Sequence, residues 1–172
     1  MYVIEAVNMS SNDWRNARDF CLHTIKEVYG ISYNSEWHSD LDAMGRAENI
    51  YLPSRRGWFI MVYDSNDNII ACAGLRALSS RPNLYEKFRI LWSDPENVGA
   101  LWRSYVAKDY RGGGIGKMMK ERRIHKAKEL GYTHLYLHAS RANKTAIVFG
   151  KKYGFSVFQE EPDGTVHMKR DI

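Results

Sequence analysis

The sequence feature that most restricts the fold is the stretch SYVAKDYRGGGIGK at residues 104–117. An apolar run ends there in a charged turn with three consecutive glycines, Gly112 to Gly114, and Gly116 follows where a helix would begin. A glycine inside a helix costs about 0.5–1 kcal/mol relative to alanine, so the chain loses stability at this point. Glycines at a strand-to-helix junction expose successive backbone N–H groups at the positive end of the helix dipole. Such a turn is typical of a phosphate-binding site.

Two common phosphate-binding motifs do not fit this stretch. The nucleotide P-loop needs a glycine where Arg111 stands, and it needs a serine or threonine where Met118 stands. The dinucleotide fingerprint Gly-x-Gly-x-x-Gly needs a third glycine at position 117 or 119, which Lys117 and Met119 occupy. Both motifs are therefore excluded.

Length and composition indicate a globular protein. The chain has 172 residues, of which 44% are hydrophobic and 26% charged, and we expect a single domain over residues 1–172. No apolar run approaches the roughly 20 residues of a membrane span, and Glu5 interrupts an N-terminus that lacks the basic region of a signal peptide. Cys21 and Cys72 are the only cysteines, so neither a disulfide framework nor a zinc site is predicted. We expect a cytoplasmic protein without a metal ion.

The charge distribution favours an anionic ligand. The net charge is +5, and the densest basic segment is KMMKERRIHKAK at residues 117–128. We interpret this segment as a solvated helix face that helps to attract an anion. Nucleic-acid binding is the less favoured interpretation of the same residues.

Apolar periodicity and turn residues predict a mixed α/β chain that begins with antiparallel pairing and continues with a parallel pair. Residues 79–98 show neither period and are expected to be irregular. Strands are predicted at residues 2–7, 57–64, 68–78, 99–107 and 133–140 and in a hairpin over 155–171, and helices at 11–30, 36–48, 115–130 and 143–154.

Two segments resemble motifs of one family. The segment VAKDYRGGGIGK fits Arg-x-x-Gly-x-Gly through Arg111, Gly114 and Gly116, and it resembles motif A of the GNAT superfamily of N-acetyltransferases. The segment NKTAIVFGKKYGF at residues 143–155 resembles the motif B helix of that family, and the order of elements matches along nearly the whole chain. The resemblance implies the α/β GNAT fold, with a mixed central sheet of about seven strands, a splayed pair after the fourth strand, and about four flanking helices.

The resemblance also implies how acetyl-CoA would bind. The N–H groups of the glycine turn would hold the pyrophosphate, and the end of the preceding strand would pair with the pantetheine arm. The N–H of Ser104 would hold the thioester oxygen, and the motif B helix would line the other side of the arm. Asn143 is also suited to cap that helix, and its Ala146 and Phe149 have the spacing of ordinary core residues. The expected binding residues are Ser104, Tyr105, Val106, Arg111, Gly112, Gly113, Gly114, Ile115, Gly116, Lys117, Asn143, Ala146 and Phe149.

The catalytic residues that the family implies are only partly matched. The expected activity is direct transfer of an acetyl group from acetyl-CoA to a primary amine, with Ser104 polarising the thioester. Many members carry a tyrosine that acts as the general acid where this chain has Gly150. Tyr153 is therefore either a general acid at a shifted position or a structural residue. Glu96 is a candidate base or an exposed loop charge. Gly150 would leave space beside the thioester for a bulkier acyl group.

Two questions stay open: whether residues of the fifth predicted strand reach the site, and which residues contact the acceptor. His134, Tyr136 and His138 alternate along one strand face, so one of them could reach the site or all could be sheet residues. The acceptor is expected to be an amine on a small molecule or peptide, and many members of the family form homodimers. Candidate acceptor-side residues, each also compatible with a core or solvated position, are Trp37, Tyr51, Trp58, Tyr85, Trp92, Glu36, Asp40 and Asp42.

An alternative function follows from Gly150. A chain that keeps the cofactor groove and lacks the usual acid could be a non-catalytic acyl-CoA-binding or sensor module. Turnover with any amine distinguishes the enzyme from this module.

Overall fold

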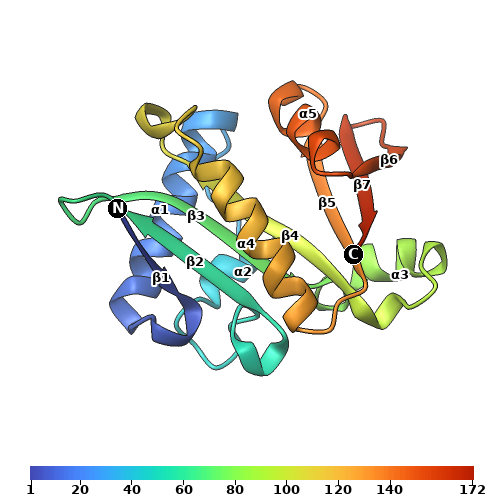
Figure 1. Ribbon diagram of the computed structural model, residues 1–172, viewed down its shortest axis with the longest axis horizontal. Helices are drawn as coiled ribbons and strands as arrows, with labels where there is room; N and C mark the ends of the chain where they lie inside the picture. The colour runs from blue at the N-terminus through green and yellow to red at the C-terminus, as the bar shows by residue number, and fades with distance from the viewer. The chain divides into compact units, whose positions relative to one another are not determined.

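The computed structural model describes residues 1–172 and confirms the mixed seven-stranded sheet (Figure 1). The strands are β1 (Tyr2–Glu5), β2 (Trp58–Tyr63), β3 (Ile69–Ala77), β4 (Val98–Val106), β5 (His134–Ser140), β6 (Ser156–Glu160) and β7 (Thr165–Asp171). The helices are α1 (Ser11–Tyr29), α2 (Ser39–Asp42), α3 (Pro82–Phe88), α4 (Ile115–Glu129) and α5 (Lys144–Lys152). The strand order is β1-β2-β3-β4-β5-β7-β6, and β4 and β5 form the expected parallel pair.

The chain folds as two compact units. Unit 1 comprises residues 1–76 and 102–123, and unit 2 comprises residues 77–101 and 124–172. Strand β4 and helix α4 each contribute residues to both units. None of the helices combines the length and the apolar character that a membrane span requires.

Unit 1 contains the antiparallel strands β1, β2 and β3 and helix α1. The side chain and backbone of Ser10 form a capping box with Asp13 at the start of α1, and Gly30 ends the helix with a left-handed φ of 66°. Every residue of β2 is buried, and Trp14 and Cys21 of α1 belong to the same core. The helix that the sequence predicts over residues 11–30 is therefore confirmed.

Helix α2 is shorter than the sequence predicts. The expected helix over 36–48 is wrong in extent, because only Ser39–Asp42 is α-helical. Upstream, the side chain of Asn34 accepts hydrogen bonds from the N–H groups of Glu36 and Trp37 and holds a turn. Downstream, Gly45 has a φ of 78°, which a continuing right-handed helix does not contain.

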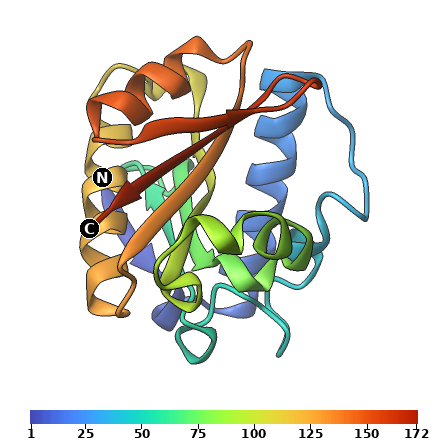
Figure 2. The same cartoon turned by 90° about the vertical axis from the view of Figure 1, so that its right-hand side faces the viewer.

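Unit 2 contains an antiparallel sheet in which β7 lies between β5 and β6 (Figure 2). The expectation that residues 79–98 are irregular is wrong, because they contain α3. Pro82 occupies the start of this helix, where its missing N–H costs nothing. Phe88 packs against Phe158, with ring centroids 5.2 Å apart. A helix of 7 residues is too short to show an apolar period, which is why the pattern missed it.

The parallel pair β4–β5 separates after a short register. Three residue pairs are formed, from Val98 with His134 to Ala100 with Tyr136, and the pairing ends before Leu101 although β4 and β5 both continue. Further along β4, Arg103 has a φ of 44°, which is rare for a residue with a side chain and marks an irregularity in the strand. The parallel pairing of β4 with β5 is therefore limited to the first three residues of each strand.

Candidate functional site

The glycine turn in unit 1 has a backbone conformation that requires glycine. Gly112 and Gly114 have φ values of 84° and 85°, in the left-handed region that L-residues avoid by about 1–2 kcal/mol. A Cβ atom built on either residue would have no heavy atom within 4 Å, and one on Gly113 would make only an ordinary contact with the Tyr110 carbonyl. Backbone conformation therefore explains Gly112 and Gly114, and the surface of the turn is open.

The same turn presents a row of N–H groups. The N–H groups of residues 112–114 donate to no backbone carbonyl, and the first bond of α4 runs from the Met118 N–H to the Gly114 carbonyl. The N–H groups of the first helical turn therefore also lack partners within the helix. Together with the helix dipole they form a site that suits a pyrophosphate, so these residues fit the anion that the motif implies.

The two cations of the motif differ in position. The Nε of Arg111 donates to the Val106 carbonyl at 2.9 Å, and its guanidinium lies 3.6 Å from Glu27. Arg111 therefore ties the turn to the end of β4. Lys117 is exposed and lies 3.9 Å from Glu121, so its ammonium can move toward an anion at the turn.

A cavity of about 450 Å³ borders the turn, and two carboxylates and one guanidinium line it. Its lining includes Asp64, Asp109, Tyr110 and Arg111. Hydrogen bonds from the Tyr110 hydroxyl and from Asn68 lower the pKa of Asp64, so this carboxylate stays ionised at neutral pH. We therefore place the anion at the N–H groups of the turn and not in this cavity.

The end of β4 also lies in unit 1. Ser104 is exposed, Tyr105 and Val106 are half-buried, and the N–H of Ala107 donates to Ile70 of β3 at 2.8 Å. The hydroxyl of Ser104 accepts a hydrogen bond from Nη2 of Arg123 at 3.0 Å. One edge of this strand end is thus anchored by β3, and Ser104 is fixed by a side chain of α4.

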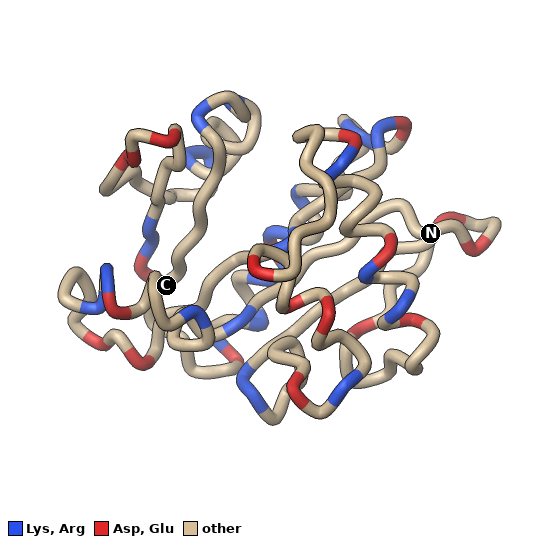
Figure 3. Tube along the Cα trace, turned by 180° about the vertical axis from the view of Figure 1, so that it is seen from behind, with Lys and Arg blue, Asp and Glu red and all other residues tan.

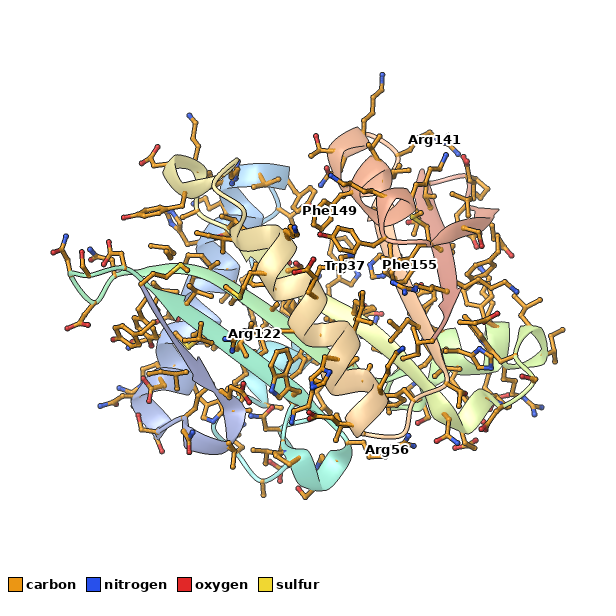
Figure 4. All side chains as sticks on the ribbon, in the orientation of Figure 1. Trp37, Arg56, Arg122, Arg141, Phe149 and Phe155 are labelled. Atoms are coloured by element: carbon orange, nitrogen blue, oxygen red, sulfur yellow. The ribbon has the colours of Figure 1, made fainter.

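Helix α5 in unit 2 carries the motif B residues. The side chain of Asn143 accepts a hydrogen bond from the N–H of Ala146 at 3.1 Å, which confirms its predicted role as a cap. Ala146 and Phe149 are half-buried, so they are not ordinary core residues. The ring of Phe149, labelled in Figure 4, lies 4.9 Å from the ring of Tyr153.

Gly150 does not leave the space that the sequence suggested. A Cβ atom at Gly150 would lie 3.1 Å from both Sδ and Cε of Met168 on β7. The side chain of Met168 already occupies the volume into which a residue at position 150 would project. The expectation of a free gap at this position is therefore wrong.

The candidate acid and base occupy different surroundings. Tyr153 ends α5, and its carbonyl accepts a hydrogen bond from Arg170 at 2.7 Å. Glu96 is exposed in a turn before β4 and accepts a hydrogen bond from the Tyr85 hydroxyl.

Side chains on β5 are engaged within unit 2. The Tyr136 hydroxyl and Nδ1 of His167 are 2.7 Å apart, and Nδ1 of His134 lies 2.8 Å from Asp171. Burial raises the pKa of Tyr136 and lowers that of His167. Tyr136 and His134 therefore have hydrogen-bonded sheet positions.

Half of the predicted acceptor-side residues are buried. The side chains of Tyr51, Trp58 and Trp92 belong to the core, whereas Trp37 is 58% exposed. Asp40 is 5% exposed, accepts hydrogen bonds from Arg103 at 2.6 and 2.9 Å, and is bonded by the Tyr51 hydroxyl. The expectation that Asp40 is a solvated charge able to attract a cationic amine is therefore wrong.

Helix α4 fits its predicted role as a solvated basic face only in part. Figure 3 marks its lysines and arginines, and two of them, Lys120 and Arg123, are only 5% and 2% exposed. Arg122, labelled in Figure 4, is half-exposed and lies 3.7 Å from Glu5. The sequence did not predict the burial of Lys120 and Arg123, because both lie within a run of basic residues. They lie on the same face of the helix as the buried residues Ile115, Met119 and Ala127.

Comparison with known proteins identifies the family. The sequence matches the family described as Acetyltransferase (GNAT) family over residues 22–155, which is well over half of the chain. The protein belongs to the GNAT acetyltransferase family. No curated protein matches its sequence.

Solved structures share the fold at low sequence identity. A GNAT-family acetyltransferase from Staphylococcus aureus Mu50 superposes with a TM-score of 0.75 at 21% identity, covering 99% of this chain and 98% of that one. The PaiA N-acetyltransferase from Thermoplasma acidophilum, in complex with coenzyme A, has a TM-score of 0.68 at 17% identity and full coverage of both chains. The ribosomal-protein-alanine N-acetyltransferase from Brucella melitensis has a TM-score of 0.69 at 15% identity, also with full coverage of both.

Proposed function

We propose that this protein is a cytoplasmic acetyl-CoA-dependent N-acetyltransferase that moves an acetyl group directly to a primary amine of a small molecule or peptide. The observation that carries the proposal is the open turn at residues 112–114, whose N–H groups have no backbone partner and precede α4. Membership of the GNAT family and the fold shared with a structure that contains coenzyme A support it.

The roles of the residues follow from their positions. The N–H groups at 112–117 would hold the pyrophosphate, and the backbone of residues 104–106 would hold the pantetheine arm. Bound acetyl-CoA supplies the activated acyl group. The N–H of Ser104 would stabilise the negative charge on the thioester oxygen, a contribution of about 3 kcal/mol for one such donor.

Turnover does not require a tyrosine at position 150. A thiolate with a pKa near 8.5 can take a proton from water at neutral pH. Deprotonating a lysine-like amine at about pH 7.4 costs about 4 kcal/mol, whereas an α-amine near pKa 8 costs under about 1 kcal/mol. The demand for a base therefore depends on the acceptor, and Tyr153 and Glu96 stay our candidates for the acid and the base.

The proposal is tested by calorimetric titration with acetyl-CoA of the wild type, Gly114→Asp and Gly164→Asp. The matched control changes a glycine that has a φ of 87° in the β6–β7 turn, so it carries similar backbone strain outside the glycine turn. We expect binding by the wild type and the control and none by Gly114→Asp. No binding by the wild type would contradict the proposal.

A screen of amines by thiol release then separates the enzyme from the non-catalytic module. The replacement of the usual acid by Gly150 is the observation that keeps the module as a second candidate. Release of coenzyme A with any amine supports the enzyme. Binding without release for every class of amine supports the module.

A further inference from the structure

Helix α4 carries an arginine on the face that packs in the core. Arg123 is 2% exposed and belongs to the same buried stripe as Met119 and Ala127. Its Nη2 donates to the hydroxyl of Ser104 at 3.0 Å, whereas its Nε and Nη1 have no hydrogen-bond partner. Buried arginines are almost always paired, so this guanidinium requires an explanation.

The charge of Arg123 is not compensated by the protein. Burial lowers its pKa to about 10, and no carboxylate is among the groups that act on it. The guanidinium is still protonated at neutral pH. An uncompensated charge in the core is unfavourable, so an anion from outside the chain would be favoured there.

The hydroxyl of Ser104 links this guanidinium to the reacting end of the donor. In the proposed function, the N–H of Ser104 holds the thioester oxygen. The guanidinium bonds the side chain of the same residue, so it lies within the length of a short acyl chain from the thioester position. Because the Ser104 hydroxyl accepts from Arg123, its own proton is free to donate to a nearby oxygen.

We propose that Arg123 binds a carboxylate on the acyl group of the donor, so that the protein prefers dicarboxylic acyl-CoA thioesters such as succinyl-CoA or malonyl-CoA. This inference rests on the proposed function. An acetyl group ends in a methyl group and leaves Nε and Nη1 without a partner. A terminal carboxylate can accept from one of these nitrogens and from the Ser104 hydroxyl. The reaction is otherwise unchanged: the amine nitrogen bonds to the carbonyl carbon, the C–S bond breaks, and the amine proton passes to solvent or to the departing thiolate.

Succinyl-CoA and butyryl-CoA form a matched pair of probes. Both acyl groups have four carbons, and a carboxylate in one replaces a methyl group in the other. We expect calorimetric titration of the wild type to give at least about tenfold tighter binding of succinyl-CoA, which corresponds to about 1.4 kcal/mol. In Arg123→Met, which keeps the length and loses the charge, the two thioesters should bind within twofold of each other. Arg122→Met, the half-exposed neighbour on α4, should keep the preference.

Several outcomes would overturn the inference. Equal binding of the two thioesters by the wild type, or a preference that survives in Arg123→Met, removes the carboxylate contact while the proposed function stands. Equal weakening of acetyl-, butyryl- and succinyl-CoA in Arg123→Met would assign the guanidinium to a part of the donor common to all three. Failure to bind any CoA thioester removes the proposed function as well. If Arg123→Met does not fold, the comparison of succinyl-CoA with butyryl-CoA binding by the wild type decides whether the inference stands.

Discussion

Two arginines of unit 1 with side chains largely shielded from solvent, Arg103 and Arg123, are in opposite situations. Arg103 on β4 donates to both oxygens of Asp40, at 2.9 and 2.6 Å, and to the carbonyl of Trp37 at 2.9 Å. Arg123 on α4 donates to a single neutral hydroxyl, that of Ser104. The comparison separates two uses of a buried cation. With its own carboxylate, an arginine holds the scaffold together; without one, it is suited to an anion that the chain does not contain.

The pKa values of Arg103 and Arg123 also differ according to whether a carboxylate is paired with the arginine. Burial alone would lower the pKa of Arg103, but the hydrogen bonds and the charge of Asp40 outweigh burial and raise it. Burial lowers the pKa of Arg123, and no carboxylate opposes this effect. The ion pair of Arg103 also fixes a residue with a left-handed φ, so it stabilises the irregularity of β4.

The largest expected effect comes from removing the carboxylate of the paired arginine. Asp40→Asn leaves Arg103 buried without a counter-charge, and we expect the free energy of unfolding to fall by about 3–5 kcal/mol. Urea unfolding at pH 7 measures the change. The control is Asp42→Asn, because Asp42 forms a more exposed pair with Arg18 and should cost less than about 1 kcal/mol. Similar losses in the two variants would contradict the division between the arginines.

The second effect should have the opposite sign. Arg123→Met removes an uncompensated charge and fills the same volume with apolar atoms, so we expect the ligand-free protein to gain about 1–4 kcal/mol. The same urea series measures the gain, with Arg122→Met as the control that should change little. A loss of stability in Arg123→Met would mean that the chain itself compensates the charge.

A smaller effect concerns acid. Burial alone would raise the pKa of Asp40, but the bonds and charge of Arg103 and the Tyr51 hydroxyl outweigh it, and the pKa lies below its ordinary value. The stability that this group contributes is therefore present above about pH 4, the unfolded value, and is lost as the pH falls through the folded pKa. Thermal unfolding between pH 6 and pH 3 should show a steeper acid loss for the wild type than for Asp40→Asn. Parallel curves would assign the acid sensitivity to other carboxylates.

The smallest effect should come from Ser104→Ala. The variant removes the one partner of Arg123, but Ser104 is exposed, so water can replace the hydroxyl and the loss should be about 1 kcal/mol or less. Urea unfolding gives the stability, and calorimetry with succinyl-CoA gives the affinity. A much larger loss of stability would show that Arg123 depends on this bond for its place in the core.

The sequence predicts those parts of the site that depend on local backbone. The turn at Gly112 and Gly114 could be predicted because only glycine adopts its conformation easily, and the cap at Asn143 because its side chain bonds within one helical turn. The burial of Arg123 could not, because it depends on how α4 packs and because a basic run hides an apolar stripe. Helix α3 was missed for lack of length, and the contact of Met168 with position 150 joins residues on two different elements.

That contact also constrains the order in which substitutions could accumulate. A tyrosine at position 150 would require the side chain of Met168 to shift or shorten, since even a Cβ atom there lies 3.1 Å from its sulfur. Shortening Met168 first would open a cavity next to Gly150, with a cost of about 2–5 kcal/mol for a change to alanine. The route to a tyrosine at position 150 therefore depends on how far the flexible end of Met168 can move, because Met168 is the side chain that the new residue meets first.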